Sequence, residues 1–100
     1  MIRSFSDKPT EKIFGNEELT RKKIRAFGLL NFQKAYDRSQ VLHLDTERDL
    51  LAAVSLHYHR LGNGRYSIDA DSRKSPWRIT FEWENEELTN VELVKIEDTH

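Results

Sequence analysis

The second half of the chain alternates apolar and polar residues with the period of a β-strand. Residues 77–83 read WRITFEW, so every second side chain is apolar, and residues 66–71 read YSIDAD with the same period. Both segments predict strands with one apolar face. Residues 90–97 predict a further strand, in which the apolar positions change parity between Leu93 and Val94. This change indicates either a β-bulge or burial on both faces of that strand.

The first half carries helix signals instead, after Ile2–Phe5, whose alternation predicts a short edge strand. Proline fits the first turn of a helix predicted over residues 9–14. Residues 17–27 are good helix formers with acids first and cations later, the order that the helix dipole favours. Residues 29–39 and 45–54 predict two further helices, and the second of them starts with an N-cap pattern.

Leu29, Phe32 and Tyr36 fall on one face of the helix predicted over residues 29–39, and such a stripe indicates a side that faces the core. Helices followed by consecutive antiparallel strands indicate an α+β fold, with the helices packed on one face of a small antiparallel sheet. The chain has 100 residues and neither an internal repeat nor a linker. We therefore expect one domain over residues 1–100.

The composition excludes several kinds of site and of protein. The chain has no cysteine, which rules out a disulfide scaffold, a thiol nucleophile and a zinc site with thiolate ligands. Its apolar runs are far shorter than the roughly 20 residues that cross a membrane. The polar residues that follow soon after Met1 predict no apolar signal segment. We therefore expect a soluble cytoplasmic protein that does not bind a membrane.

Charge is unevenly distributed, although the formal net charge is only −1. Residues 60–78 carry five cationic and two acidic side chains, whereas residues 79–100 carry one cationic and seven acidic side chains. A cationic stretch of this kind either binds phosphate groups or pairs with acidic neighbours across a sheet. Charge alone leaves both interpretations open.

His57 and His59 are two residues apart, so on a strand both side chains point the same way. With a carboxylate such a pair can bind a metal, but no third ligand stands at a recognisable spacing. We expect neither a metal nor another cofactor. Gly62–Gly64 is too short for a phosphate-binding loop and lacks a following helix, so it predicts a turn between strands.

Arg78 lies in the predicted strand 77–83 on the side opposite the apolar residues, so we expect its guanidinium to be exposed on the open face of the sheet. With Tyr66 nearby as a stacking surface, such a face suits the backbone of single-stranded RNA. The alternative is a solvated face without a ligand. Four further cations are expected to converge there: Arg60, Arg65, Arg73 and Lys74.

Three segments carry a family resemblance: GRYSI at residues 64–68, WRITF at residues 77–81 and IEDTH at residues 96–100. Together with the opening residues Met1–Phe5, they resemble the HigB-type plasmid-maintenance killer toxins of the RelE/ParE superfamily of type II toxin–antitoxin systems. The resemblance implies a RelE/ParE-like fold and a metal-independent, ribosome-dependent mRNA endonuclease that inhibits translation. It also implies a cognate HigA-like antitoxin, with operator DNA bound only through the toxin–antitoxin complex.

The same resemblance implies catalytic roles for individual residues. Arg78 matches the arginine of the family's WRITF strand and would stabilise the scissile phosphate. His100 matches the family's terminal histidine and would transfer a proton, with Asp98 orienting it or the substrate. His57 aligns with the family histidine before the turn, although His59 is almost as good a match.

Arg60 stands for the family's lysine at the same turn, and two departures leave other functions open. The turn at Leu61–Gly64 is shorter than the family's, and Thr99 stands where many relatives have tyrosine. One alternative is a toxin fold that has lost nuclease activity and acts as an antitoxin-binding corepressor. The other is a gyrase-directed toxin of the ParE type. For the nuclease, further RNA contacts are expected from Arg65, Tyr66, Arg73, Lys74 and His59.

Overall fold

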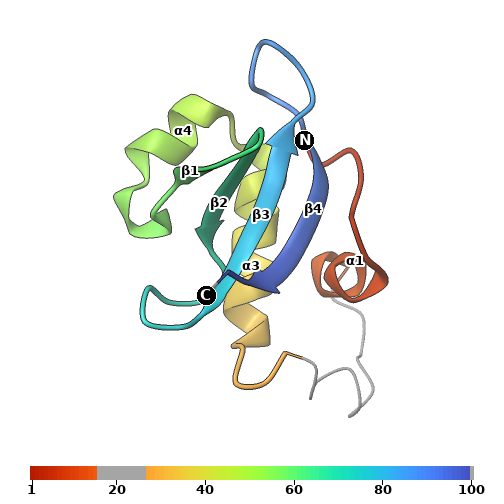
Figure 1. Ribbon diagram of the computed structural model, residues 1–100, viewed down its shortest axis with the longest axis vertical. Coiled ribbons are helices and arrows are strands. Elements are labelled where there is room, and N and C mark those ends of the chain that lie inside the picture. The colour runs from red at the N-terminus through yellow and green to blue at the C-terminus, as the bar shows by residue number, and fades with distance from the viewer. Residues whose placement is uncertain (16–26, 100) are drawn as a thin grey trace.

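The computed structural model describes residues 1–15 and 27–99, and it has the α+β architecture expected from the sequence (Figure 1). Its four-stranded sheet is antiparallel, with the strand order β1-β2-β3-β4. The strands are β1 His59–Gly62, β2 Arg65–Asp69, β3 Trp77–Trp83 and β4 Val91–Asp98. The described helices are α1 Lys8–Phe14, α3 Phe32–Leu44 and α4 Glu47–Ala52, with a 3-10 turn, η1, at Val54–Leu56. None of these described helices is long and apolar enough to cross a membrane.

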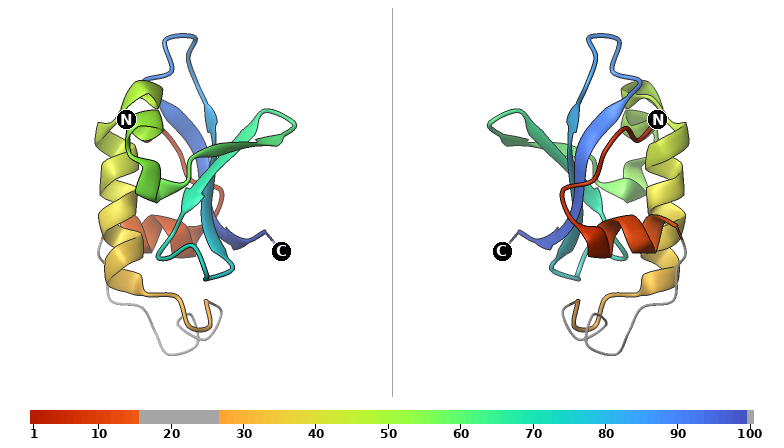
Figure 2. Two further views of the ribbon diagram at one scale, coloured as in Figure 1. Left: turned by 90° about the vertical axis from the view of Figure 1, so that its left-hand side faces the viewer. Right: turned by 90° about the vertical axis from the view of Figure 1, so that its right-hand side faces the viewer.

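The helices lie on one side of the sheet, as the two side views in Figure 2 show. We call the side of the sheet that faces them the inner face and the opposite side the outer face. Ile68, Ile79 and Phe81 of the inner face are fully buried and belong to one core with Leu42 and Leu50 of the helices. Each such side chain contributes roughly 1.5–3 kcal/mol of burial free energy, so this layer holds the helices on the sheet.

Capping chemistry sets the start of two helices. α1 confirms the first predicted helix. Its start is set by Asp7, whose carboxylate accepts a hydrogen bond from the Thr10 amide at 2.9 Å. α4 begins after Thr46, whose amide and hydroxyl both donate to the Asp49 carboxylate, at 2.9 and 3.1 Å. The start of α4 agrees with the N-cap pattern of the sequence, and α1 begins one residue before the helix predicted over residues 9–14.

α3 differs from the helix predicted over residues 29–39. It begins after Asn31, whose side chain accepts a hydrogen bond from the third helical amide at 3.1 Å, and it continues to Leu44. Leu29 therefore precedes the helix and is 99% exposed, so its assignment to the core stripe is wrong. The other two members of that stripe do pack against the core.

The N-terminal segment Ile2–Phe5 lies along the edge of β4 that β3 leaves open. It runs parallel to β4 and pairs with it only at Val91 and Val94, so the predicted edge strand is reduced to two isolated bridges. The helix predicted over residues 17–27 falls almost wholly outside the described residues.

A bulge in β4 accounts for the change of parity in its sequence. The register of β3 with β4 shifts between Thr80 and Glu82, and Leu93 adopts a left-handed backbone with φ of 52°. The hydroxyl of Ser4 accepts a hydrogen bond from the Leu93 amide, and the hydroxyl of Ser6 donates to the Leu93 carbonyl, each at 2.9 Å. The predicted bulge is confirmed, and the N-terminal segment holds it in place.

Candidate active site on the outer face of the sheet

The register of the sheet gathers polar side chains on the outer face. Because successive side chains of a strand point to opposite faces, residues paired across the sheet share a face. The pairing gives two neighbouring rows: His59, Ser67, Thr80 and Lys95 in the first, and Asp69, Arg78 and Glu97 in the second. The candidate site therefore draws on all four strands.

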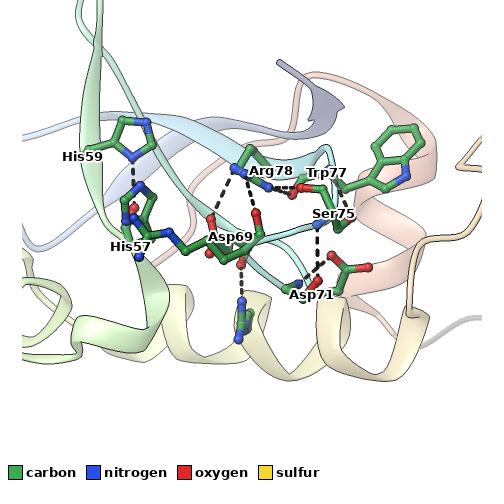
Figure 3. A network of polar contacts seen from close by, with 10 residues as sticks. His57, His59, Asp69, Asp71, Ser75, Trp77 and Arg78 are labelled. Atoms are coloured by element: carbon green, nitrogen blue, oxygen red, sulfur yellow. Dashed lines mark hydrogen bonds and ion pairs between the residues drawn. The ribbon is translucent and has the colours of Figure 1, made fainter. Parts of the chain in front are cut away.

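Arg78 is on the outer face as expected, but it is buried. Only 8% of the residue is accessible, and its Nε lies 3.2 Å from Oδ1 of Asp69. Nη1 donates to the carbonyls of Ser75 and Trp77, and Nη2 donates to the carbonyl of Arg73 (Figure 3). All three guanidinium nitrogens thus have partners within the protein.

The burial of Arg78 has two causes that the alternation of its strand does not reveal. The register places Asp69 directly opposite, and the β2–β3 loop, residues 70–76, turns backbone carbonyls toward the guanidinium. The contact with Asp69 is an ion pair and not an aligned hydrogen bond, because Oδ1 accepts no hydrogen bond from any described residue. The expectation of an exposed Arg78, ready to meet a phosphate, is therefore wrong.

Arg65 lies on the outer face and is also bound within the protein. Its Nη2 donates to the Thr80 hydroxyl at 2.8 Å, and its Nη1 donates to the Glu82 carboxylate at 3.2 Å. The Thr80 hydroxyl in turn donates to Glu97 at 2.8 Å. At this residue the interpretation in which central cations pair with acidic residues across the sheet is confirmed.

Tyr66 lies on the inner face, so it offers no stacking surface beside Arg78. The register pairs it with Phe81, and the two rings stack with their centroids 6.3 Å apart. Its ring also stacks on Tyr58 at 5.8 Å. The placement of Tyr66 on the open face is wrong because its position in the strand is in phase with the core residues.

Tyr58, which stands between the two candidate histidines in the sequence, is anchored on the inner side. Its hydroxyl donates to the Glu47 carboxylate at 2.7 Å and accepts from the indole Nε1 of Trp83 at 3.0 Å. Burial, together with the hydrogen bond to Glu47, raises the pKa of Tyr58 above its usual value. The hydroxyl therefore remains a donor, and the residue is fixed.

His57 and His59 lie together at the β1 end of the outer face (Figure 3). His57 follows the 3-10 turn in a left-handed conformation with φ of 53°, and His59 opens β1. The ring centroids are 5.0 Å apart, and Nδ1 of His59 is 2.9 Å from the carbonyl oxygen of His57. Both residues are half-buried, which leaves them partly open to solvent. The expected proximity is confirmed, although only His59 belongs to a strand.

The other expected cations do not gather at one point. Arg73 and Lys74 are exposed in the β2–β3 loop, whereas Arg60 is exposed on the edge strand and pairs in register with Tyr66 of the inner face. Within the described part of the chain, these three side chains form no ion pair. Their charges are thus accessible to a phosphate, unlike those of Arg65 and Arg78, which have partners within the sheet.

The C-terminal candidates are only partly placed. Asp98 is exposed at the end of β4, where the register pairs it with Trp77. His100 lies outside the described residues. Among residues 1–15 and 27–99, no three His, Asp or Glu side chains are grouped in a way that would hold a metal ion.

Asp71 ties the β2–β3 loop to the start of α3. Its carboxylate accepts hydrogen bonds from the amides of Asn31 at 3.0 Å and Ser72 at 2.7 Å. Burial on its own would raise the pKa of Asp71, but these bonds and one to the Ser75 side chain outweigh it and lower the pKa. The β2–β3 loop is therefore held by two groups: Asp71 ties it to the start of α3, and Arg78 binds its carbonyls.

Sequence reasoning missed Asp69 and Asp71, the two acids that organise this region. Their polar positions in the alternating segment 66–71 were visible, but the partner of each depends on the register and on the path of the following loop. A cation and an anion on the polar positions of consecutive strands were the available signal for an internal pair.

Comparison of the chain with protein-family models, with curated proteins and with solved structures returned no match.

Proposed function

We propose that this protein is the toxin of a type II toxin–antitoxin pair and that it cleaves mRNA on the ribosome without a metal ion. The observation that carries the proposal is the pair of imidazole rings of His57 and His59, with centroids 5.0 Å apart. Cleavage of RNA by its own 2′-hydroxyl needs one group to accept a proton and another to release one, and imidazole does both near neutral pH. Asp98 and His100 keep the roles that the resemblance implies.

Phosphate binding in this proposal belongs to the exposed cations. Arg73 and Lys74 are accessible in the β2–β3 loop, whereas Arg60 follows His59 in β1 and is exposed at a position in register with the inner face. Cations of this kind stabilise the negative charge that develops on the phosphorane. Arg78 becomes a positioning residue, because its guanidinium holds the carbonyls of the loop that carries the two accessible cations.

Primer extension on a reporter mRNA in a reconstituted translation system tests the proposal. The wild-type protein should cut mRNA only when ribosomes are present, and His57→Ala should slow the cutting by about 100-fold or more. Glu87→Gln, which changes an exposed side chain in the β3–β4 loop, is the control and should cut like the wild type. Folded wild-type protein that leaves ribosome-bound mRNA intact would sink the proposal.

The contribution of the loop cations is tested in the same assay. Replacing Arg73 and Lys74 together by alanine should weaken cleavage and flatten its dependence on salt, because two phosphate contacts are lost. The matched control replaces Lys34 and Arg48, two exposed cations on α3 and α4, and should leave both quantities unchanged. Equal effects from the two pairs would mean that only overall charge matters.

The enclosure of Arg78 favours a second candidate, an antitoxin-binding corepressor without nuclease activity. A guanidinium whose three nitrogens are all occupied receives a phosphate only after the β2–β3 loop opens. Induction without the antitoxin separates the candidates. Growth arrest supports the nuclease, whereas normal growth with intact promoter repression by the toxin–antitoxin pair supports the corepressor.

A further inference from the structure

The contact between the His59 ring and the backbone of His57 fixes the tautomer of His59. Nδ1 of His59 lies 2.9 Å from the carbonyl oxygen of His57. A carbonyl oxygen only accepts hydrogen bonds, so Nδ1 carries the hydrogen. In the neutral ring the lone pair is then on Nε2, the nitrogen farther from the backbone.

We infer that His59 is the general base of the cleavage reaction and that its Nε2 accepts the proton of the attacking 2′-hydroxyl. This inference rests on the proposed function. It goes beyond the resemblance, which gives His57 a catalytic role and His59 an RNA contact and leaves open which of the two matches the family histidine. The assignment comes from the direction of one hydrogen bond.

The backbone around His59 preorganises this arrangement. His57 adopts a left-handed conformation with φ of 53°, which residues other than glycine rarely adopt. Tyr58 is anchored on the inner side by Glu47 and Trp83. The carbonyl that receives the Nδ1 hydrogen is thus held from both sides, and the ring of His59 is oriented before any substrate arrives.

The other basic groups in the two outer-face rows are already engaged. Asp69 is paired with Arg78, and Glu97 accepts a hydrogen bond from Thr80. The ammonium group of Lys95 donates hydrogen bonds and has no acceptor lone pair. In His59, by contrast, the hydrogen bond to the His57 carbonyl uses Nδ1 and leaves the lone pair on Nε2 available.

The proposed step transfers protons between the two histidines and the substrate. The O–H bond of the 2′-hydroxyl breaks, its proton moves to Nε2 of His59, and the oxygen forms a bond to the adjacent phosphorus. The bond from phosphorus to the 5′-oxygen breaks, and that oxygen takes a proton from the imidazolium of His57. The products are a 2′,3′-cyclic phosphate and a 5′-hydroxyl, and proton exchange with water restores both rings.

The tautomer is tested without reference to activity. In a long-range ¹H–¹⁵N spectrum of the full chain, the neutral His59 ring should show a protonated Nδ1 and an unprotonated Nε2. His59→Gln identifies the signals by removing them. A neutral ring with the hydrogen on Nε2 would overturn the inference, because the proposed acceptor would be blocked.

The role of the base is tested with a variant that keeps the local hydrogen bond. The amide group of asparagine can donate to the His57 carbonyl from nearly the position of Nδ1, but it has no basic nitrogen. His59→Asn should melt like the wild type and cleave about 100-fold more slowly. In His59→Ala, added imidazole should restore cleavage at least about tenfold, which a purely structural role would not allow.

The outcomes separate this inference from the proposed function. A wild type that cleaves mRNA together with a His59→Asn variant that cleaves equally fast would overturn the assignment of the base and leave the nuclease in place. A folded wild type that does not cleave would overturn both. Slow cleavage by His59→Asn with rescue of His59→Ala by imidazole supports both.

Discussion

The two faces of the sheet are both buried at their centre, but different kinds of side chain bury them. On the inner face Ile68, Ile79 and Phe81 are covered by helices and exclude water by apolar packing. On the outer face, Asp69 and Thr80 are as inaccessible as the core residues, yet they are covered by long charged side chains and by a loop. A polar position in a strand is therefore not the same as an exposed position.

The difference between the faces follows from what each kind of burial requires. Apolar side chains need only contact and shape, so the inner face tolerates approximate packing. Buried charges need partners for each donor and acceptor, and an unpaired group costs several kcal/mol by order of magnitude. Loss of a hydrogen-bond or ion-pair partner should thus destabilise the protein at the outer face, whereas loss of side-chain volume should destabilise it at the inner face.

Removal of volume from the inner face should have the largest effect on stability. Phe81 is fully buried and its ring lies against Tyr58, Tyr66 and Trp83. Phe81→Ala should lower the free energy of unfolding by about 4 kcal/mol, because it removes transfer free energy and leaves a cavity. Urea denaturation followed by circular dichroism measures this change. Phe81→Leu, which keeps most of the volume, should recover more than half of the loss.

Removal of a charged partner from the outer face should have the second-largest effect on stability. Arg78→Ala should cost about 3 kcal/mol, because it leaves Asp69 buried without its cation and frees the carbonyls of Arg73, Ser75 and Trp77. Arg78→Lys should recover only part of this loss, since an ammonium group does not reproduce the guanidinium fork.

A double-mutant cycle isolates the ion pair itself. Adding Asp69→Ala to Arg78→Ala should cost less than the sum of the two single changes, with a coupling of about 2 kcal/mol between these contacting residues. Denaturation midpoints of the four proteins provide the coupling. Additive changes would show that the loop carbonyls, and not Asp69, account for the stability that Arg78 provides.

The two faces also differ in how much of their structure the sequence predicts. The alternation of residues 77–83 predicts the strand and its apolar side, because it follows the two-residue period. The parity change in β4 predicts either a bulge or burial on both faces, and the structure shows the bulge. The inner position of Tyr66 follows from the same period, so the RNA-stacking role suggested for it conflicted with the pattern. The start of α3 at Asn31 was also available as an N-cap signal.

The enclosure of Arg78 could not be predicted from the sequence in the same way. It depends on the register that sets Asp69 opposite and on the path of the β2–β3 loop, and neither is a local property of the sequence. The contact between His59 and the carbonyl of His57 likewise depends on the left-handed backbone of His57. The candidate residues could be named from the sequence, but their roles depend on tertiary contacts.

A smaller and pH-dependent effect is expected at the loop that covers the outer face. Asp71→Asn should cost about 2 kcal/mol at pH 7, because the carboxylate accepts hydrogen bonds from Asn31 and Ser72. The pKa of Asp71 is lowered in the folded protein, so its stabilisation is complete above the unfolded pKa and is lost as the pH falls through the folded pKa. The difference between variant and wild type should therefore shrink below about pH 4. A difference that stays constant down to pH 2.5 would contradict this origin.

The smallest expected effects come from two neighbouring hydroxyls of the outer face, and they should have opposite signs. Thr80 is fully buried and its hydroxyl joins Arg65 to Glu97, so Thr80→Val should cost about 1–2 kcal/mol, because each of these two charged groups loses one hydrogen bond. Ser67 is also fully buried, but its hydroxyl has no hydrogen-bond partner among the described residues. Ser67→Ala should thus raise the free energy of unfolding by up to about 1 kcal/mol, because it removes a desolvated polar group that makes no bond. Thermal melts of both variants measure the sign and size of the two stability changes. If Ser67→Ala is destabilising by as much as Thr80→Val, then the Ser67 hydroxyl has a partner in solution, and the outer face depends on partners at every buried polar position.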